Sequence, residues 1–205
     1  MKPLLLITLA APLYAQSWYP RHTFSLGVGA GSPRQELAGP FRDSAGIAVG
    51  YGRRFHRNFQ ADVGLDTVIG AARVRDYLES SFGDLRIRDY QFLIPFGVRA
   101  ILPMDRGRFL VSAGGGGVHM RYTELLRQPS DYIRIDCRVC SSRSGWGVYA
   151  LVGASMALDR YQRFRLGVAS RIYRGYTNGD SLGLVPGIRT KDQWVNVFGE
   201  FGISF

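Results

Sequence analysis

The chain has 205 residues, a length that suits one domain, with 46% hydrophobic residues and a formal net charge of +10. Beyond the N-terminal stretch, no apolar run approaches the ~20 residues that a membrane-spanning helix needs, which excludes helical spans from the remainder. Lys2 and Lys191 are the only lysines among the 26 basic residues; the others are arginines, which bind phosphate bidentately.

The N-terminus has the pattern of a secretory signal peptide. Lys2 is followed by an apolar core from Leu4 to Ala11, and small residues then lead to Ala15 and polar Gln16. A signal peptide at 1–15 and a periplasmic segment at 16–22 are predicted. In an exported chain, the basic surplus favours anionic lipid or lipopolysaccharide phosphates, rather than nucleic acid, as partners.

Eight later segments have the alternation expected of strands, with apolar residues on one parity and polar or small residues on the other. In the fifth segment, Gly114–Gly117 leaves the phase undetermined, and Pro95 in the fourth predicts a local bulge. The predicted strands are 23–31, 44–52, 58–70, 87–102, 108–122, 145–158, 164–175 and 194–205.

The connections between these segments alternate in length. Three are short (53–57, 103–107 and 159–162), and four are long (32–43, 71–86, 123–144 and 176–190). An eight-stranded antiparallel up-and-down transmembrane β-barrel over 23–205 needs this pattern, with short periplasmic turns and long extracellular loops. A soluble β-sandwich gives a similar composition but no reason for strict alternation. In lipid the barrel must close, because an open sheet edge leaves backbone groups unpaired.

The last strand ends on Phe205, with Ile203 and Phe201 at alternate positions before it. This ending resembles the closing strand of bacterial outer-membrane barrels, and the whole pattern resembles the OmpA transmembrane domain, the OmpX/Ail group and OmpW. The resemblance implies location in the bacterial outer membrane. It also implies that the barrel-assembly machinery recognises Phe201, Ile203 and Phe205.

The polar parity should face a lumen that eight strands make just wide enough for side chains to fill. Charges there must pair or remain hydrated, so we expect an arginine–carboxylate network that argues against a wide pore. Its predicted members are Asp62, Asp66, Arg99, Arg165, Arg171 and Glu200, with Gln60 and Gln91 nearby.

Aromatic residues near the strand ends predict two interfacial girdles. The turn-side girdle would hold Phe55, Phe59, Phe109, Tyr161, Phe164 and Phe205, and the loop-side girdle Tyr122, Trp146, Tyr173, Tyr176 and Trp194.

Candidates for chemistry are few. Cys137 and Cys140 predict a disulfide that braces the longest loop, because the chain is exported and lacks further zinc ligands at suitable spacing. His119 is the one residue to test for lipid A modification, but Arg121 stands where the deacylase among such barrels has a serine, and Ser112 is distant along the strand. We therefore predict no enzyme, catalytic residue, cofactor or metal site.

The predicted function is a surface scaffold that is anchored in the outer membrane and displays four loops. These loops are rich in arginine and would either graze lipopolysaccharide phosphates or bind an extracellular ligand as the Ail group does. The alternatives are a narrow channel for small or hydrophobic solutes and a lipid A-modifying enzyme. The loop arginines are Arg73, Arg75, Arg86, Arg127, Arg134, Arg138, Arg143 and Arg189.

Overall fold

The computed structural model describes residues 20–205, apart from 74–76, 81–82, 129–134, 138 and 183. The predicted signal peptide and residues 16–19 of the predicted periplasmic segment lie outside the described residues. The strands are β1 (His22–Gln35), β2 (Ser44–His56), β3 (Phe59–Ile69), β4 (Tyr77–Ser80), β5 (Gly83–Met104), β6 (Phe109–Leu126), β7 (Ser142–Ala157), β8 (Phe164–Gly179) and β9 (Thr190–Ser204). Two 3₁₀ turns, η1 (Glu36–Ala38) and η2 (Asp105–Gly107), are the helical elements of the described chain, and neither could span a membrane.

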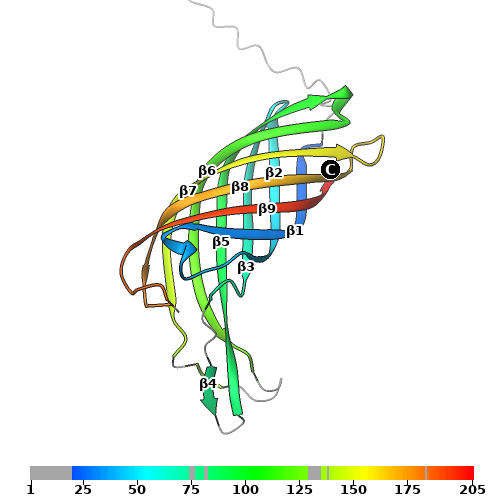
Figure 1. Cartoon of the computed structure of the whole chain (residues 1–205). Coiled ribbons are helices and arrows are strands. Elements are labelled where there is room, and N and C mark those ends of the chain that lie inside the picture. The colour runs from blue at the N-terminus through cyan, green and yellow to red at the C-terminus, as the bar shows by residue number, and fades with distance from the viewer. Residues whose placement is uncertain (1–19, 74–76, 81–82, 129–134, 138, 183) are drawn as a thin grey trace, which may run out of the picture.

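Eight of these strands form a closed antiparallel barrel. Each barrel strand pairs with its neighbours in chain order, β3 pairs with β5, and β1 closes the ring by pairing with β9. Figure 1 shows the first strand beside the last. The short β4 pairs with the start of β5 and lies beyond the barrel, on the loop side. The predicted eight-stranded fold is confirmed, although part of the expected 71–86 loop is a β-hairpin.

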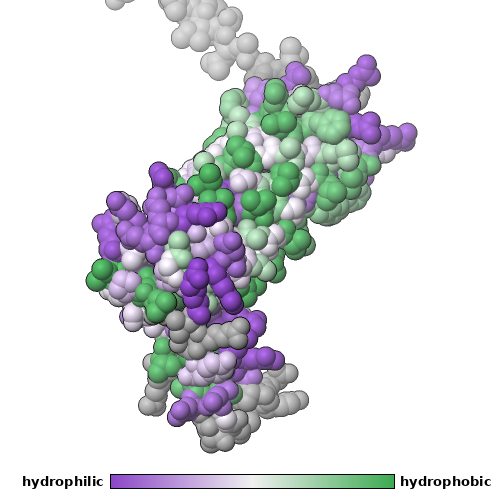
Figure 2. Space-filling view, in the orientation of Figure 1, coloured by the Kyte–Doolittle hydropathy of each residue, from purple (hydrophilic) through white to green (hydrophobic). Residues whose placement is uncertain are grey.

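Apolar side chains cover the outside of the barrel. On β1, Phe24, Leu26 and Val28 are exposed, and on β8 the same holds for Leu166, Val168 and Ile172. In Figure 2 hydrophobic residues cover much of the visible face of the barrel wall, and hydrophilic residues gather at the loop end. The opposite parity points inward, as on β9, where Asp192, Trp194, Asn196 and Phe198 are all buried. This distribution is the reverse of that in a soluble protein and suits a lipid surrounding.

The structure corrects one expectation on β5 and supplies the strand phase that the sequence left undetermined on β6. The β3–β5 ladder keeps one register across the gap between its Val63–Phe96 and Asp66–Leu93 pairs, so Pro95 interrupts pairing without the expected bulge. The glycine run of β6 pairs continuously with both neighbours, which fixes its phase. A Cβ on Gly117 would clash with the Phe96 ring, so glycine leaves room for that aromatic side chain.

The turn-side aromatic girdle is confirmed in position, since all six of its predicted members are exposed. The loop-side girdle is partly wrong. Trp146 and Tyr176 face outward, but Tyr122, Tyr173 and Trp194 are completely buried inside the barrel. Their parity on the strands, which is that of the lumen residues, places them there and outweighs their position near the strand ends.

Candidate functional site

The loop-side half of the lumen is filled by an aromatic plug, which consists of Leu37, Phe41, Tyr122 and Trp194. Leu37 and Phe41 come from the β1–β2 connection, which folds into the barrel mouth and buries both side chains. The Phe41 ring centroid lies 5.7 Å from that of Trp194 and 6.1 Å from that of Tyr122. Trp194 Nε1 donates a hydrogen bond of 3.1 Å to the Tyr122 hydroxyl, so the buried polar atoms of these rings satisfy one another.

Backbone hydrogen bonds hold this connection in the mouth. Arg42 N donates to Ala71 O at 2.8 Å, and Arg73 N donates to Pro40 O at 2.9 Å. The Arg73 side chain adds a bond from its Nε to Phe41 O at 3.0 Å. Arg73, which the sequence analysis placed among the loop arginines that contact phosphates or a ligand, therefore also fastens one loop to the next.

A second group, the Arg143 cluster, ties the β8–β9 connection to the barrel. It consists of Arg143, Thr177, Thr190 and Asp192, all buried. The guanidinium donates to both threonine hydroxyls at 2.8 Å, to Thr177 O, and to the carbonyls of Pro186 and Ile188. The two threonines donate in turn to Asp192. The expectation that Arg143 belongs to a solvated loop surface is wrong, because its parity on β7 turns it inward.

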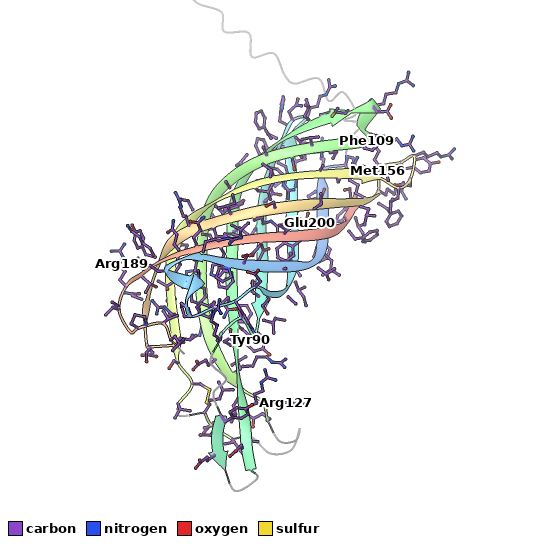
Figure 3. All side chains as sticks on the ribbon, in the orientation of Figure 1. Tyr90, Phe109, Arg127, Met156, Arg189 and Glu200 are labelled. Atoms are coloured by element: carbon purple, nitrogen blue, oxygen red, sulfur yellow. A yellow bond between two sulfur atoms is a disulfide. The ribbon has the colours of Figure 1, made fainter. Side chains whose placement is uncertain are left out.

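Deeper in the lumen lies the Arg171 cluster, which consists of Arg171, Asp66, Glu200, Tyr173 and Asn196. Arg171 Nη1 donates to Asp66 Oδ1 at 2.6 Å, and Nη2 donates to Glu200 Oε1. Tyr173 donates its hydroxyl to Asp66 Oδ2 at 2.6 Å, while Asn196 Nδ2 lies 3.4 Å from the same oxygen. Figure 3 labels Glu200 on the ribbon of β9, between the two ends of the barrel.

A separate ion pair joins Arg99 and Asp62. Arg99 donates through Nε and Nη2 to the two carboxylate oxygens, at 2.6 and 2.8 Å, which is a bidentate contact. Gln60 adds a bond of 2.7 Å to Asp62 Oδ1. Five of the six predicted lumen charges thus lie in two groups, of which the Arg171 cluster is the more buried.

Arg165 does not join either group. Its Nη2 donates to Gly107 O at 2.7 Å and to Gln162 Oε1 at 3.1 Å, and it makes no ion pair with a described carboxylate within 4.0 Å. It faces inward as predicted, at the turn end of β8, where its guanidinium bonds to Gly107 and Gln162 in the neighbouring turns instead of to a carboxylate.

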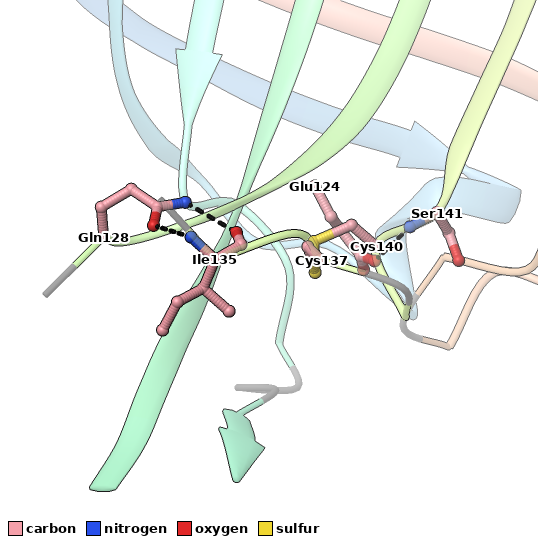
Figure 4. The surroundings of a disulfide bond; sticks show 6 residues. All are labelled: Glu124, Gln128, Ile135, Cys137, Cys140 and Ser141. Atoms are coloured by element: carbon pink, nitrogen blue, oxygen red, sulfur yellow. Dashed lines mark hydrogen bonds between the residues drawn. A yellow bond between two sulfur atoms is a disulfide. The ribbon is translucent and has the colours of Figure 1, made fainter. Parts of the chain in front are cut away.

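The cysteines and the closing strand lie where the sequence analysis placed them. Cys137 and Cys140 form a disulfide in the β6–β7 connection, with their Cα atoms 5.3 Å apart. Figure 4 shows its surroundings, including the bond of 2.9 Å from Ser141 N to Glu124 Oε2. Phe201, Ile203 and Phe205 are exposed on the outer face at the turn end of the barrel.

His119 does not form an arrangement for nucleophilic catalysis with Ser112. The two residues have opposite parity on β6; Ser112 lines the lumen, while the His119 ring lies outside, 4.6 Å from the Trp146 ring. Among the described residues, no group of three or more histidine, cysteine or acidic side chains could hold a metal ion.

Several residues that shape the lumen were missed by the sequence analysis. Leu37 and Phe41 gave no signal, because they lie in a connection without strand periodicity. Phe198 had a usable signal, since it shares the inward parity of Glu200; its ring lies 5.5 Å from the Arg171 guanidinium.

Comparison with known proteins places the fold. No family model and no curated protein matches the chain. Among solved structures, the Neisserial surface protein A is 11% identical, with a TM-score of 0.54 and coverage of 90% of this chain and 97% of that one. The outer-membrane protein OprG from Pseudomonas aeruginosa is 12% identical, with a TM-score of 0.56 and coverage of 91% and 97%. At these identities the likeness shows a shared fold, that of small outer-membrane barrels.

Proposed function

We propose that the chain is a bacterial outer-membrane barrel that acts as a closed scaffold and displays its loops at the cell surface. Outer-membrane location is supported by the exposed apolar wall, by barrel closure, and by the outer-membrane proteins that share the fold. On this topology the three turns face the periplasm and the four loops face outward.

The observation that carries the scaffold role is the occupied lumen. From the loop end inward, the Arg143 cluster, the aromatic plug and the Arg171 cluster follow one another along β9, at Asp192, Trp194 and Glu200. Water and small solutes would have to displace buried rings and separate a buried ion pair to pass. The scaffold therefore fits this lumen better than the narrow channel does.

Outward-facing cations at the loop-side edge of the apolar wall support lipopolysaccharide phosphates as partners. Arg34 and Arg174 flank Gln193 in the strand register, and Lys191 lies opposite Tyr176. All of these side chains except Gln193 are exposed, and the Arg189 guanidinium lies 4.2 Å from the Tyr176 ring centroid. Arginine, lysine and an interfacial tyrosine at this depth suit anionic headgroups. The exposed loops beyond this row would carry the contacts with an extracellular ligand.

Planar-bilayer conductance tests the scaffold against the channel. The purified protein should give no discrete openings, whereas Phe41→Ala with Trp194→Ala, which removes two rings from the aromatic plug, should give small ones. Frequent openings of the unaltered protein would refute the closed scaffold.

We also propose that the chain is not a lipid A-modifying enzyme, because its one candidate histidine is turned away from Ser112. Lipid A from cells that express the protein or its His119→Ala variant should give the same pattern on thin-layer chromatography. A change in acylation that depends on His119 would contradict this.

A further inference from the structure

The turn end of the barrel carries an excess of exposed arginines. Two of them lie at each of the three turns, taken as residues 53–58, 105–108 and 158–163, whereas the side-chain carboxylates of these fully described stretches are Asp105 and Asp159. In Figure 2 hydrophilic residues project beyond the apolar wall at the end opposite the loops. The exposed turn arginines are Arg53, Arg57, Arg106, Arg108, Arg160 and Arg163.

These arginines lie at the edge of the turn-side aromatic girdle. Arg108 Cζ lies 6.0 Å from the ring centroid of Phe109. Arg160 and Arg163 both lie over the Tyr161 ring, with their Cζ atoms 4.7 and 5.7 Å from its centroid. A stacked guanidinium keeps the donors at its edge available, apart from the one that Arg160 gives to the Tyr161 hydroxyl. Because aromatic girdles mark the interfaces of a barrel, these cations lie at the depth of lipid headgroups.

A polar hollow of about 390 Å³, the turn hollow, lies between the second and third turns. Arg106, Arg108 and Arg160 line it together with Asp105 and Asp159. None of the three arginines makes an ion pair within 4.0 Å with a carboxylate of the described residues. Asp159 is already engaged, because it accepts two backbone N–H groups of its own turn. The turn hollow therefore has a positive surplus and suits an anion.

Hydrogen bonds between the two turns fix the shape of the turn hollow. Gln162 Nε2 donates to Arg106 O at 2.9 Å, and Ala157 N donates to Arg108 O at 2.7 Å. Both arginine side chains thus project from an anchored backbone. Such a preformed site loses less conformational freedom when it binds a ligand.

An apolar groove of about 500 Å³, the wall groove, lies on the lipid-facing side of β6, β7 and β8. Ala154 stands between Val111 and Val168 in the strand register, and its small side chain leaves a depression there. Phe109 and Met156 border the groove on the turn side, where Figure 3 labels both near the turn end of the barrel.

The linings of the turn hollow and the wall groove meet, because Phe109 and Met156 directly neighbour Arg108 and Ala157 in the chain. We propose that the two together form a binding site for an anionic phospholipid. Its phosphate lies against the three arginines of the turn hollow, and one of its acyl chains lies in the wall groove. A zwitterionic phospholipid fills the same groove but brings no net charge to offset the arginines.

This inference rests on the membrane location and topology of the proposed function, which place the turn end in the periplasmic leaflet. It does not depend on the row of cations at the loop-side edge, which lies at the other interface.

Amide NMR of the full-length barrel in nanodiscs tests the site, as phosphatidylglycerol replaces phosphatidylcholine with the same acyl chains. The signals of Gly107, Arg108 and Leu158 should shift together and saturate at a low fraction of phosphatidylglycerol. The signal of Asn58, in the first turn and outside the turn hollow, should shift less and without saturation. Equal, unsaturated shifts at all three turns would show diffuse attraction and overturn the proposal.

Two variants separate the headgroup from the acyl chain. Arg108→Gln should raise the half-saturating fraction of phosphatidylglycerol about fivefold, the effect expected of one arginine beside an anionic lipid surface. Ala154→Phe, which fills the wall groove and leaves every arginine in place, should also raise it. Arg57→Gln is the matched control, an exposed arginine of the first turn, and should leave it unchanged. An effect of Arg57→Gln equal to that of Arg108→Gln would overturn the site, as would the absence of an effect in both Arg108→Gln and Ala154→Phe.

Inorganic phosphate, titrated into phosphatidylcholine nanodiscs, distinguishes a lipid from a free anion. It should give no saturable shift, and saturation of the same signals by phosphate would overturn the assignment to a lipid. A barrel that failed to insert into nanodiscs would instead contradict the proposed function, so the two failures are distinguishable.

Discussion

Replacement of Arg171 by glutamine should destabilise the barrel strongly, because it removes the one cation of the Arg171 cluster. The side chains of Arg171, Asp66 and Glu200 are 7%, 0% and 15% exposed, so both carboxylates would stay in the lumen without a countercharge. Asp66 would retain the Tyr173 hydroxyl, whereas Glu200 accepts no other hydrogen bond from the described residues.

The expected magnitude follows from the cost of a broken buried pair. Removal of one partner typically costs about 3–5 kcal/mol, while replacement of all charged members by apolar or neutral groups of similar size is often close to neutral. Arg171→Gln should therefore lower the unfolding free energy by about 3–5 kcal/mol. The triple variant Arg171→Met, Asp66→Leu, Glu200→Gln should recover most of that loss, because no unpaired charge remains.

Reversible unfolding in urea with lipid vesicles, monitored by tryptophan fluorescence, measures these differences. Arg174→Gln is the matched control, since Arg174 lies three residues further along β8 and faces outward. The control should change stability by less than about 1 kcal/mol. If Arg171→Gln behaved like this control, or if the triple variant were the least stable of the three, the account of the lumen would be wrong.

Three further predictions concern the ends of the barrel. Arg143→Met should cost about 2–4 kcal/mol, because five hydrogen bonds from a buried guanidinium are lost, and it should expose the β8–β9 connection to limited proteolysis. Phe41→Ala should cost about 3–5 kcal/mol in the same urea assay, since the surrounding strands cannot collapse onto the space. The pKa of the Asp159 carboxyl is lowered, chiefly by the hydrogen bond that the Phe164 backbone N–H donates to it. The ionised carboxylate therefore stabilises the turn fully above the ordinary carboxyl pKa, and this stabilisation is lost as pH falls through the lowered value. Amide exchange of Phe164 should accelerate over that acid range, and in Asp159→Asn it should no longer respond to pH there.

The sequence predicted the features that depend on strand periodicity. Alternation along each segment placed Leu26 and Val168 outside and Asp66 and Arg171 inside, because a strand turns successive side chains to opposite faces. The prediction was wrong for Trp194 and Tyr122, because their position near the strand ends was given more weight than their inward parity. It could not predict the inward fold of Phe41, because a connection has no period and its path is set by contacts with distant strands.

Partners across the lumen were also beyond the reach of the sequence. Asp66 and Arg171 are 105 residues apart, and which inward charges meet depends on the stagger of all eight strands. The list of inward charges could therefore be written in advance, but the division into an Arg99–Asp62 pair, an Arg171 cluster and a separate Arg165 could not.

Closure of the barrel between its first and last strands is most directly tested by thiol cross-linking in membranes. Ala30 and Val197 lie opposite each other in the β1–β9 register and face outward. In a Cys137→Ser, Cys140→Ser background, cysteines at 30 and 197 should join efficiently with a short cross-linker, and cysteines at 30 and 201 should not. Equal yields from both pairs, or a chain that stays soluble in water without detergent, would contradict a ring of strands closed within lipid.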